Sequence, residues 1–137
     1  MQQLVTPPLN NGETYIGAIG DKNGDVYHII LLPGDNDDSG WQNAMDWAKS
    51  IGGDLPNRVE QAMLYAQHKE EFKKDWYWSC EQHASDSGCA WSQYFLTGYQ
   101  GYHYLFSKLR ARAVRRWLAG GCRPSPRPIR MRLGCRT

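Results

Sequence analysis

The chain has 137 residues, of which 41% are hydrophobic, 12% aromatic and 22% charged. This balance fits one globular domain and excludes a wholly disordered chain. No apolar run approaches the roughly 18 to 20 residues that a membrane-spanning helix needs, and residues 1–8 lack the basic and apolar regions of a signal peptide. We therefore expect a protein with no secretion signal that does not enter a membrane.

Charge is distributed unevenly along the chain. Residues 1–86 hold 14 acidic and six basic side chains, a net charge of −8, whereas residues 87–137 hold ten basic side chains and no acidic ones, a net charge of +10. Such asymmetry can mark a surface for nucleic acid or another acidic partner, but part of it cancels when both halves fold into one domain. Nucleic acid is therefore an alternative partner rather than the favoured one.

Residues 15–32 predict a β-hairpin, with strands at 15–19 and 26–32 and a turn that contains Asn23-Gly24. Residues 35–40 form a polar loop that ends in good helix N-cap residues. Apolar side chains then recur at helical spacing and predict a helix over 41–51, which Gly52-Gly53 ends.

A second helix begins at Asn57, after the extended Leu55-Pro56 step. Asn57 can cap it, and Glu60 stands three residues later, as a capping box requires. The spacing predicts a buried stripe made of Val59, Ala62, Met63 and Ala66. Residues 69–75 are charged around one phenylalanine and indicate a solvated turn or helix end.

The apolar period changes from about 3.6 to 2 after Asp75, which predicts a strand over 76–80. A loop over 81–88 leads to a second strand at 90–96, antiparallel to the first. A turn at 97–101, an extended segment at 102–106 and a strand at 109–116 follow. The fold class is α+β, with two helices packed on an antiparallel sheet and hairpins.

The last residues differ in composition from the rest of the chain. Residues 118–137 contain five arginines and three of the seven prolines. This composition predicts a disordered Arg/Pro-rich tail. The chain is therefore divided into a single domain over 1–117 and a tail over 118–137.

The four cysteines do not form a CxxC pair, so neither a zinc ribbon nor a thioredoxin motif is present. We interpret them as free thiols or small core residues, with Cys80 and Cys89 able to meet across two strands. Cys80, His83 and Asp86 are the one candidate nucleophilic set, and proximity in sequence does not establish its geometry. We predict no catalytic site.

Calcium is the second chemical candidate, because residues 35–38 concentrate oxygen ligands. The spaced acids, glycine and final glutamate of an EF-hand are absent, and acidic residues also suit the start of the helix that follows. We therefore predict no metal and no cofactor.

Four segments in this order resemble the Lcl C-terminal domain family: 53–60 (GDLPNRVE), 76–79 (WYWS), 90–91 (AW) and 112–115 (RAVR). Cys80 departs from the pattern, which usually has a second serine there. That family has no defined molecular function and occurs in bacterial surface proteins and as short stand-alone phage proteins. The resemblance implies a C-type-lectin-like fold, a core position for Trp78 and Trp91, and a phage protein located in the host cytoplasm or the virion.

The late aromatic segment is the predicted binding surface. Aromatic and arginine side chains supply rigid contact area and planar donors, which anchor interfaces and stack on sugars or bases. Our leading hypothesis is a non-enzymatic recognition module that binds a protein or glycan, with its oligomeric state left open. The predicted ligand-binding residues are Tyr94, Leu96, Tyr99, Gln100, Tyr102, His103, Tyr104, Arg110 and Arg112.

The alternative hypothesis belongs to another class. A small phage protein inside the host can inhibit a defence enzyme or a nucleic-acid-handling enzyme, or bind nucleic acid through its basic C-terminal third. Direct nucleic-acid binding is distinguished by its sensitivity to salt, because neutralised phosphates release counterions.

Overall fold

The computed structural model describes residues 6–118. The tail predicted over 118–137 lies outside the described residues apart from its first residue. The elements run in this order: β1 (Thr14–Gly20), β2 (Val26–Leu31), β3 (Asn36–Ser39), α1 (Trp41–Ser50), α2 (Arg58–His68), the short 3-10 helix η1 (Lys69–Glu71), β4 (Trp76–Gln82), β5 (Cys89–Tyr94), β6 (Gln100–Tyr104), β7 (Leu109–Ala111) and β8 (Val114–Leu118).

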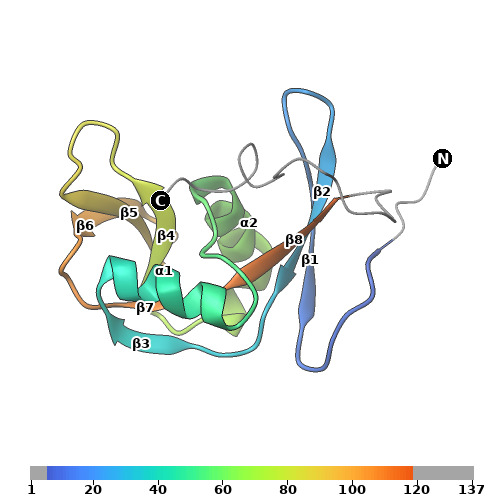
Figure 1. Cartoon of the computed structure of the whole chain (residues 1–137), viewed down its shortest axis with the longest axis horizontal. Helices are drawn as coiled ribbons and strands as arrows, with labels where there is room; N and C mark the ends of the chain where they lie inside the picture. Colours follow the sequence, from blue (N-terminus) through green and yellow to red (C-terminus); the bar gives the residue numbers. More distant parts are fainter. Residues whose placement is uncertain (1–5, 119–137) are drawn as a thin grey trace.

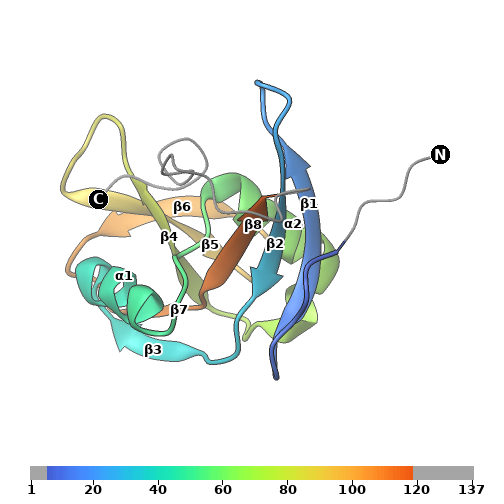
Figure 2. The ribbon, with the colours of Figure 1, turned by 45° about the vertical axis from the view of Figure 1, so that its right-hand side comes forward.

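Two sheets make up the framework. A three-stranded sheet has the order β1-β2-β8, and a five-stranded sheet has the order β3-β7-β4-β5-β6. All strand pairs are antiparallel except β4 with β7. The small sheet lies at the right of Figure 1 and the β4–β5–β6 part of the large sheet at the left, with α2 between them in that view. In Figure 2, α2 lies behind the strands of the small sheet. The α+β class with two helices and mostly antiparallel strands is confirmed.

Each face of the large sheet is covered by its own hydrophobic core. On one face, Trp78 and Ala90 pack with Trp41, Ala44 and other side chains of α1. On the opposite face, Tyr77 packs with residues of α2 and of the small sheet, among them Leu64, Ile29 and Val114. Because both helices cover only part of the sheet, the remaining part of each face carries side chains that reach solvent.

The predicted hairpin and first helix are confirmed, but the segment between them is not a loop. Residues 36–39 form β3, which pairs with β7 across a register irregularity. The expected side-chain cap of α1 is wrong as well, since its N-cap is Gly40 and no side chain caps the helix. The Trp41 amide instead donates to the Leu105 carbonyl at 2.9 Å, so a distant turn satisfies the first helical N–H.

The capping box at the start of α2 is confirmed: the Asn57 side chain accepts from the Glu60 amide, and the Glu60 carboxylate accepts from the Asn57 amide. The predicted buried stripe is wrong. Val59, Ala62 and Ala66 are exposed and Met63 is half-buried.

The buried side of α2 carries Glu60, Gln61 and Leu64 instead. Gln61 donates to the carbonyls of Tyr77 and Trp78, both at 3.1 Å. Partners on β2 and β8 satisfy the Glu60 carboxylate, and β4 carbonyls satisfy the Gln61 amide nitrogen, whereas the buried Gln61 Oε1 has no hydrogen-bond partner among the described residues.

The predicted strand over 109–116 divides into two, because the chain crosses from one sheet to the other. Residues 109–111 join the large sheet as β7, and residues 114–118 join the small sheet as β8. Arg112 lies at the crossing and is buried, with guanidinium hydrogen bonds to the carbonyls of Glu71 and Leu32. The crossing therefore fixes the two sheets relative to each other.

The tryptophan and cysteine predictions have mixed outcomes. Trp78 is fully buried, as expected, whereas Trp91 is only half-buried, so its predicted core position is wrong. Cys89 is a free, buried thiol, as expected. Cys80 is buried and disulfide-bonded, so for it the expectation of a free thiol is wrong, and it is not bonded to Cys89. In residues 6–118, no helix is long and apolar enough to cross a membrane.

Candidate ligand-binding surface

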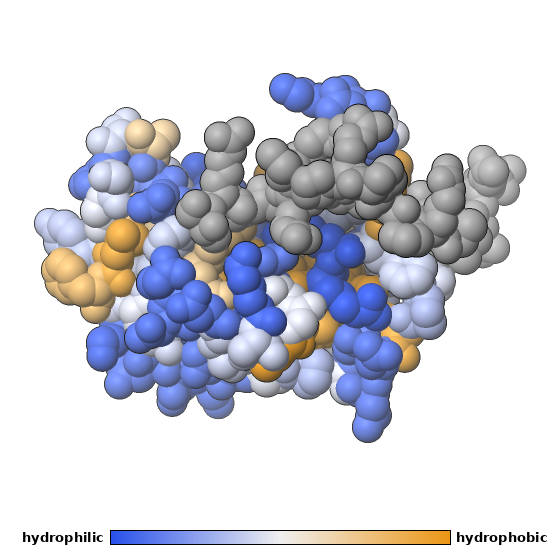
Figure 3. All heavy atoms as spheres, viewed as in Figure 1, coloured by the Kyte–Doolittle hydropathy of each residue, from blue (hydrophilic) through white to orange (hydrophobic). Residues whose placement is uncertain are grey.

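Exposed apolar side chains concentrate in one short segment between the end of β5 and the turn after β6. The described residues include eight large hydrophobic side chains that are exposed, and five of them lie in this segment: Leu96, Tyr99, Tyr102, Tyr104 and Phe106. Hydrophobic side chains also reach the surface at the left of Figure 3, over the part of the molecule where Figure 1 places β6 and the start of its connection to β7. A local concentration of this kind marks a candidate interaction surface.

Four rings form what we call the Trp76 cluster: Trp76, Tyr94, Tyr99 and His103. Trp76 and Tyr94 are opposite each other on β4 and β5, and their rings stack with centroids 4.9 Å apart and planes 16° apart. Tyr99 meets Trp76 edge-on at 6.2 Å, and His103 does so at 4.8 Å. Such stacked and edge-on contacts hold the rings in fixed positions.

Exposure differs within the Trp76 cluster. Trp76, Tyr94 and His103 are half-buried, whereas Tyr99 is 65% exposed. Gly101 lies beneath the rings, because a Cβ at that position would be 3.2 Å from the Tyr99 ring and 3.4 Å from that of Trp76. The absence of a side chain there lets the rings lie close to the backbone of β6. The cluster is thus a preformed aromatic platform with one open side.

His103 supplies a polar group within this cluster. Its Nδ1 is 2.8 Å from the Ser92 hydroxyl, which fixes the orientation of the imidazole. Burial lowers the pKa of His103 below its usual value. The ring is therefore neutral at neutral pH and offers hydrogen bonding rather than charge.

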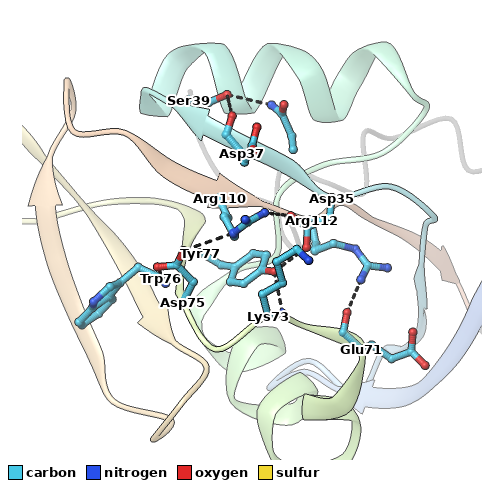
Figure 4. Close-up of polar contacts among 11 residues, drawn as sticks. Asp35, Asp37, Ser39, Glu71, Lys73, Asp75, Trp76, Tyr77, Arg110 and Arg112 are labelled. Carbon is cyan, nitrogen blue, oxygen red and sulfur yellow. Dashed lines mark hydrogen bonds and ion pairs between the residues drawn. The ribbon is translucent and has the colours of Figure 1, made fainter.

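A charged group borders the Trp76 cluster, at the start of β4. Asp75 precedes Trp76 and forms an ion pair of 3.3 Å with Arg110, which also pairs with Asp35 at 3.0 Å. Figure 4 shows Arg110 between these two carboxylates, with the Trp76 ring directed away from them. The Asp75 side chain is 54% exposed. The Asp75 carboxylate thus adjoins the backbone of Trp76 but is directed toward Arg110 rather than toward the aromatic platform.

Tyr77 anchors the other end of this polar network. Its hydroxyl donates to Asp35 at 2.5 Å and accepts from the Lys73 amide at 3.0 Å (Figure 4). Burial, together with the hydrogen bond to Asp35, raises the pKa of Tyr77. The hydroxyl therefore stays protonated and acts as a fixed donor that positions Asp35.

A second group, the Trp91 cluster, occupies the opposite face of the sheet and consists of Arg58, His83, Trp91 and Tyr102. The Arg58 guanidinium carbon lies 3.5 Å from the centroid of the Trp91 ring, and His83 stacks on Trp91 at 5.1 Å. Tyr102 meets both rings, at 5.4 Å from Trp91 and 4.4 Å from His83. Trp91 is thus engaged by three neighbours of this chain, one of them a guanidinium group over its ring face.

The structure brings only some of the predicted binding residues together. Tyr94, Tyr99 and His103 share the Trp76 cluster, and Arg110 borders it through Asp75. Tyr102 belongs to the Trp91 cluster on the other face. The sequence interpretation grouped Tyr99 with Tyr102, but the turn residue and the strand residue lie on opposite sides of the sheet.

The remaining predicted residues have other positions. Leu96 is exposed, and Tyr104 stacks on Phe106 at 5.2 Å. Gln100 is half-buried and donates to the carbonyl of Arg58 and to Gln93. Arg112 does not line the surface: its buried guanidinium holds backbone carbonyls, so its assignment as a ligand-binding residue conflicts with its structural position.

Sequence reasoning missed Trp76, Arg58 and His83. Period-2 alternation placed Trp76 on the same face as Trp78, but that signal does not reveal where helix α1 stops covering the face. Arg58 and His83 are separated from Trp91 by 33 and eight positions and meet it only through tertiary structure. In the sequence, nothing but their residue types indicated that Arg58 and His83 could contact an aromatic ring.

The candidate nucleophilic set is not assembled. Asp86 accepts from the Cys89 thiol at 3.5 Å, and His83 Nδ1 accepts from the Ser85 amide at 3.2 Å while its ring stacks on Trp91. In the described part of the chain, no group of three or more His, Cys, Asp or Glu side chains has an arrangement that could hold a metal ion.

The arginines of the basic C-terminal third are largely paired within the described region. Arg115 pairs with Glu13 at 2.8 Å, and Arg116 pairs with Glu60 at 2.7 Å. Arg110 and Arg112 have the carboxylate and carbonyl partners given above. The charge separation along the sequence therefore cancels in space at Arg110, Arg115 and Arg116, whereas Arg112 bonds uncharged backbone carbonyls.

No protein-family model matches the chain, and no curated protein matches it.

Proposed function

We propose that this protein is a non-enzymatic ligand-recognition module that binds a protein or glycan through the Trp76 cluster. The observation that carries the proposal is the stacked Trp76–Tyr94 pair with Tyr99 open beside it. Aromatic side chains with fixed orientations give large contact area at little cost in conformational entropy, which is why they anchor binding surfaces.

The border of the cluster supports the same function. The neutral His103 imidazole adds a hydrogen-bonding group to the aromatic platform. An apolar platform with a few fixed polar groups is the usual composition of a site that recognises a sugar ring or an exposed peptide side chain. In this proposal, Trp76 and Tyr99 provide contact area while His103 provides specificity.

We further propose that the fold is C-type-lectin-like and that the chain is a phage protein related to the Lcl C-terminal domain family. Two helices, a terminal-strand sheet with β1 and β8, and a larger antiparallel sheet are compatible with such a fold. The sequence segments that carry the resemblance lie at the helix-to-helix turn, β4, β5 and β8. A place in the host cytoplasm or the virion follows from the resemblance alone.

The alternative, nucleic-acid binding through the basic C-terminal third, has less support among the described residues. Four arginines of that third are engaged with carboxylates or carbonyls of the same chain. Phosphate contacts would have to compete with those ion pairs. Inhibition of a host enzyme by contact remains a form of the protein-binding proposal.

The proposal is tested by screening the purified full chain on an array of defined glycans and on a protein microarray, then measuring Kd for the strongest hit. We expect Trp76→Ala and Tyr99→Ala each to weaken binding about tenfold or more, as loss of an aromatic anchor does. The control is Phe106→Ala, because Phe106 is 76% exposed in the same segment but lies outside the Trp76 cluster.

Circular dichroism and thermal unfolding should show that all three variants keep the fold. Equal Kd values for wild type and both cluster variants would refute the site assignment. Binding that falls in step with rising salt for every variant would favour the alternative, since it would indicate phosphate or other polyanion contacts.

A further inference from the structure

Among residues 6–118, strand β6 forms one edge of the five-stranded sheet and pairs on one side only, with β5. Backbone bonds from the Tyr94 amide to the Tyr99 carbonyl (2.8 Å) and from the Leu105 amide to the Gly88 carbonyl (3.0 Å) show which residues face β5. In an antiparallel pair these positions alternate. Gly101 and His103 therefore direct their backbone groups to β5, and Gln100, Tyr102 and Tyr104 direct theirs away from the sheet.

The other three sheet edges carry features that discourage pairing with another chain. β1 has a register irregularity between Tyr15 and Gly17. β3 has a similar irregularity, two aspartates and a positive φ of 55° at Asp38. β8 carries Arg115 and Arg116. Bulges and charged side chains are the usual protection of an exposed edge.

β6 has none of these features. Its sequence, QGYHY, contains neither proline nor a carboxylate, lysine or arginine, and its five residues pair with β5 in an uninterrupted register. Tyr102 and Tyr104 are also exposed. A regular, uncharged and aromatic edge is an available template for another strand.

We propose that two copies of this chain associate by antiparallel pairing of β6 with β6, which joins their large sheets into one. The register places Tyr102 opposite Tyr102 of the second copy, on the two-fold axis. Gln100 then lies opposite Tyr104 of the second copy, and the outward backbone groups of both strands meet. An interface of this kind is self-complementary, as closed two-fold symmetry requires.

A second copy fits this edge because β6 carries no charged side chain and can pair with an identical strand. Like charges placed opposite each other would destabilise a symmetric pair, and no Asp, Glu, Lys or Arg lies on β6. Tyrosine opposite tyrosine is a favourable cross-strand pair. Because the two strands run in opposite directions, the turn after β6 of one copy, which carries the exposed Phe106, lies beside the turn before β6 of the other, which carries the exposed Leu96. This arrangement would cover apolar surface on both copies. Association should therefore respond little to salt.

Sedimentation equilibrium of the full chain over a range of concentrations tests the proposal. We expect wild type to reach a dimer and Tyr102→Lys to raise the dimer Kd about tenfold or more, because two ammonium groups would face each other at the axis. The matched control is Val59→Lys, which adds the same charge at a similarly exposed position on α2 and should leave the dimer Kd unchanged.

Amide hydrogen exchange locates the interface independently of any variant. The Tyr102 amide points away from β5, so pairing of the two strands should slow its exchange at high protein concentration and dilution should restore it. A protein that stays monomeric at all concentrations would overturn the proposal. So would a dimer whose Tyr102 amide exchanges equally fast at both concentrations, since another surface would then hold the copies together.

Discussion

The buried pair of Glu60 and Arg116 is a polar contact that links a helix to the small sheet. The Glu60 side chain is fully buried and accepts four hydrogen bonds: from the Tyr27 hydroxyl at 2.9 Å, from Arg116 Nε at 2.7 Å and Nη2 at 2.8 Å, and from the Asn57 amide at 2.8 Å. It thereby joins α2 to both β2 and β8. Glu60→Gln keeps the shape, removes the charge and brings an amide donor toward the guanidinium donors.

The expected loss can be worked out from these contacts. Removal of one partner of a buried ion pair costs about 3–5 kcal/mol, because the other charge stays buried. Arg116 keeps Asp54 at 3.2 Å and the Leu55 carbonyl at 3.2 Å, so we expect the lower end, about 3 kcal/mol. For a domain of this size, that loss lowers Tm by about 12 °C at roughly 4 °C per kcal/mol.

Urea unfolding followed by circular dichroism measures this loss. The control is Glu70→Gln on the exposed η1 helix, which should change the free energy of unfolding by less than about 0.5 kcal/mol. The double variant Glu60→Gln/Arg116→Met should lose less than the sum of the two single variants, because the pair is coupled. A Glu60→Gln variant as stable as the control would refute the reasoning.

Three further predictions concern stability. The hydrogen bond from Arg115, against opposing burial, lowers the pKa of Glu13 from 4.5 to about 2, so the pair stabilises the fold above pH 4.5 and this contribution is lost as pH falls toward 2. Allowing for solvent screening, the free energy of unfolding of wild type should exceed that of Glu13→Gln by on the order of 1–2 kcal/mol above pH 4.5, and this difference should vanish as pH falls toward 2. An identical pH dependence of unfolding in both proteins would contradict the pairing. Gly53→Ala should lose about 2 kcal/mol or more in thermal unfolding, because its Cβ would lie 2.5 Å from the Val114 carbonyl oxygen, and an unchanged Tm would show that this close approach is absent. Tyr77→Phe should lose about 1–3 kcal/mol in urea unfolding by leaving Asp35 and the Lys73 amide without that hydroxyl, whereas unchanged stability would show that neither bond contributes.

Local signals in the sequence were sufficient for the features that depend on nearby residues. The capping box of α2 needs only Asn57 and Glu60, three positions apart, and it was predicted correctly. The buried face of the same helix was predicted wrongly, because its polar residues depend on partners far along the chain. Glu60 meets Arg116, and Gln61 meets the backbone of Tyr77. Hydrophobic spacing cannot report such contacts.

In the candidate site, too, the features set by nearby residues were predicted and those set by distant contacts were not. Alternation correctly indicates that Trp76 and Trp78 share a face, but α1 covers only Trp78 and leaves Trp76 in contact with Tyr94 and His103. Arg110 and Arg112 are likewise two residues apart, yet the crossing between sheets buries the second. Which end of a sheet face is covered is decided by tertiary packing, and the sequence alone carries no local signal for it.

Two-dimensional NMR of the tryptophan indole N–H groups is the most direct test of the proposed binding surface. The strongest hit from the glycan and protein arrays is titrated into the labelled full chain, and the indole signals are assigned through single Trp→Phe variants. We predict that the Trp76 signal shifts in proportion to occupancy while that of Trp91, on the opposite face, stays in place. A shift of Trp91 with an unchanged Trp76 signal would contradict the assignment of the Trp76 cluster as the binding site.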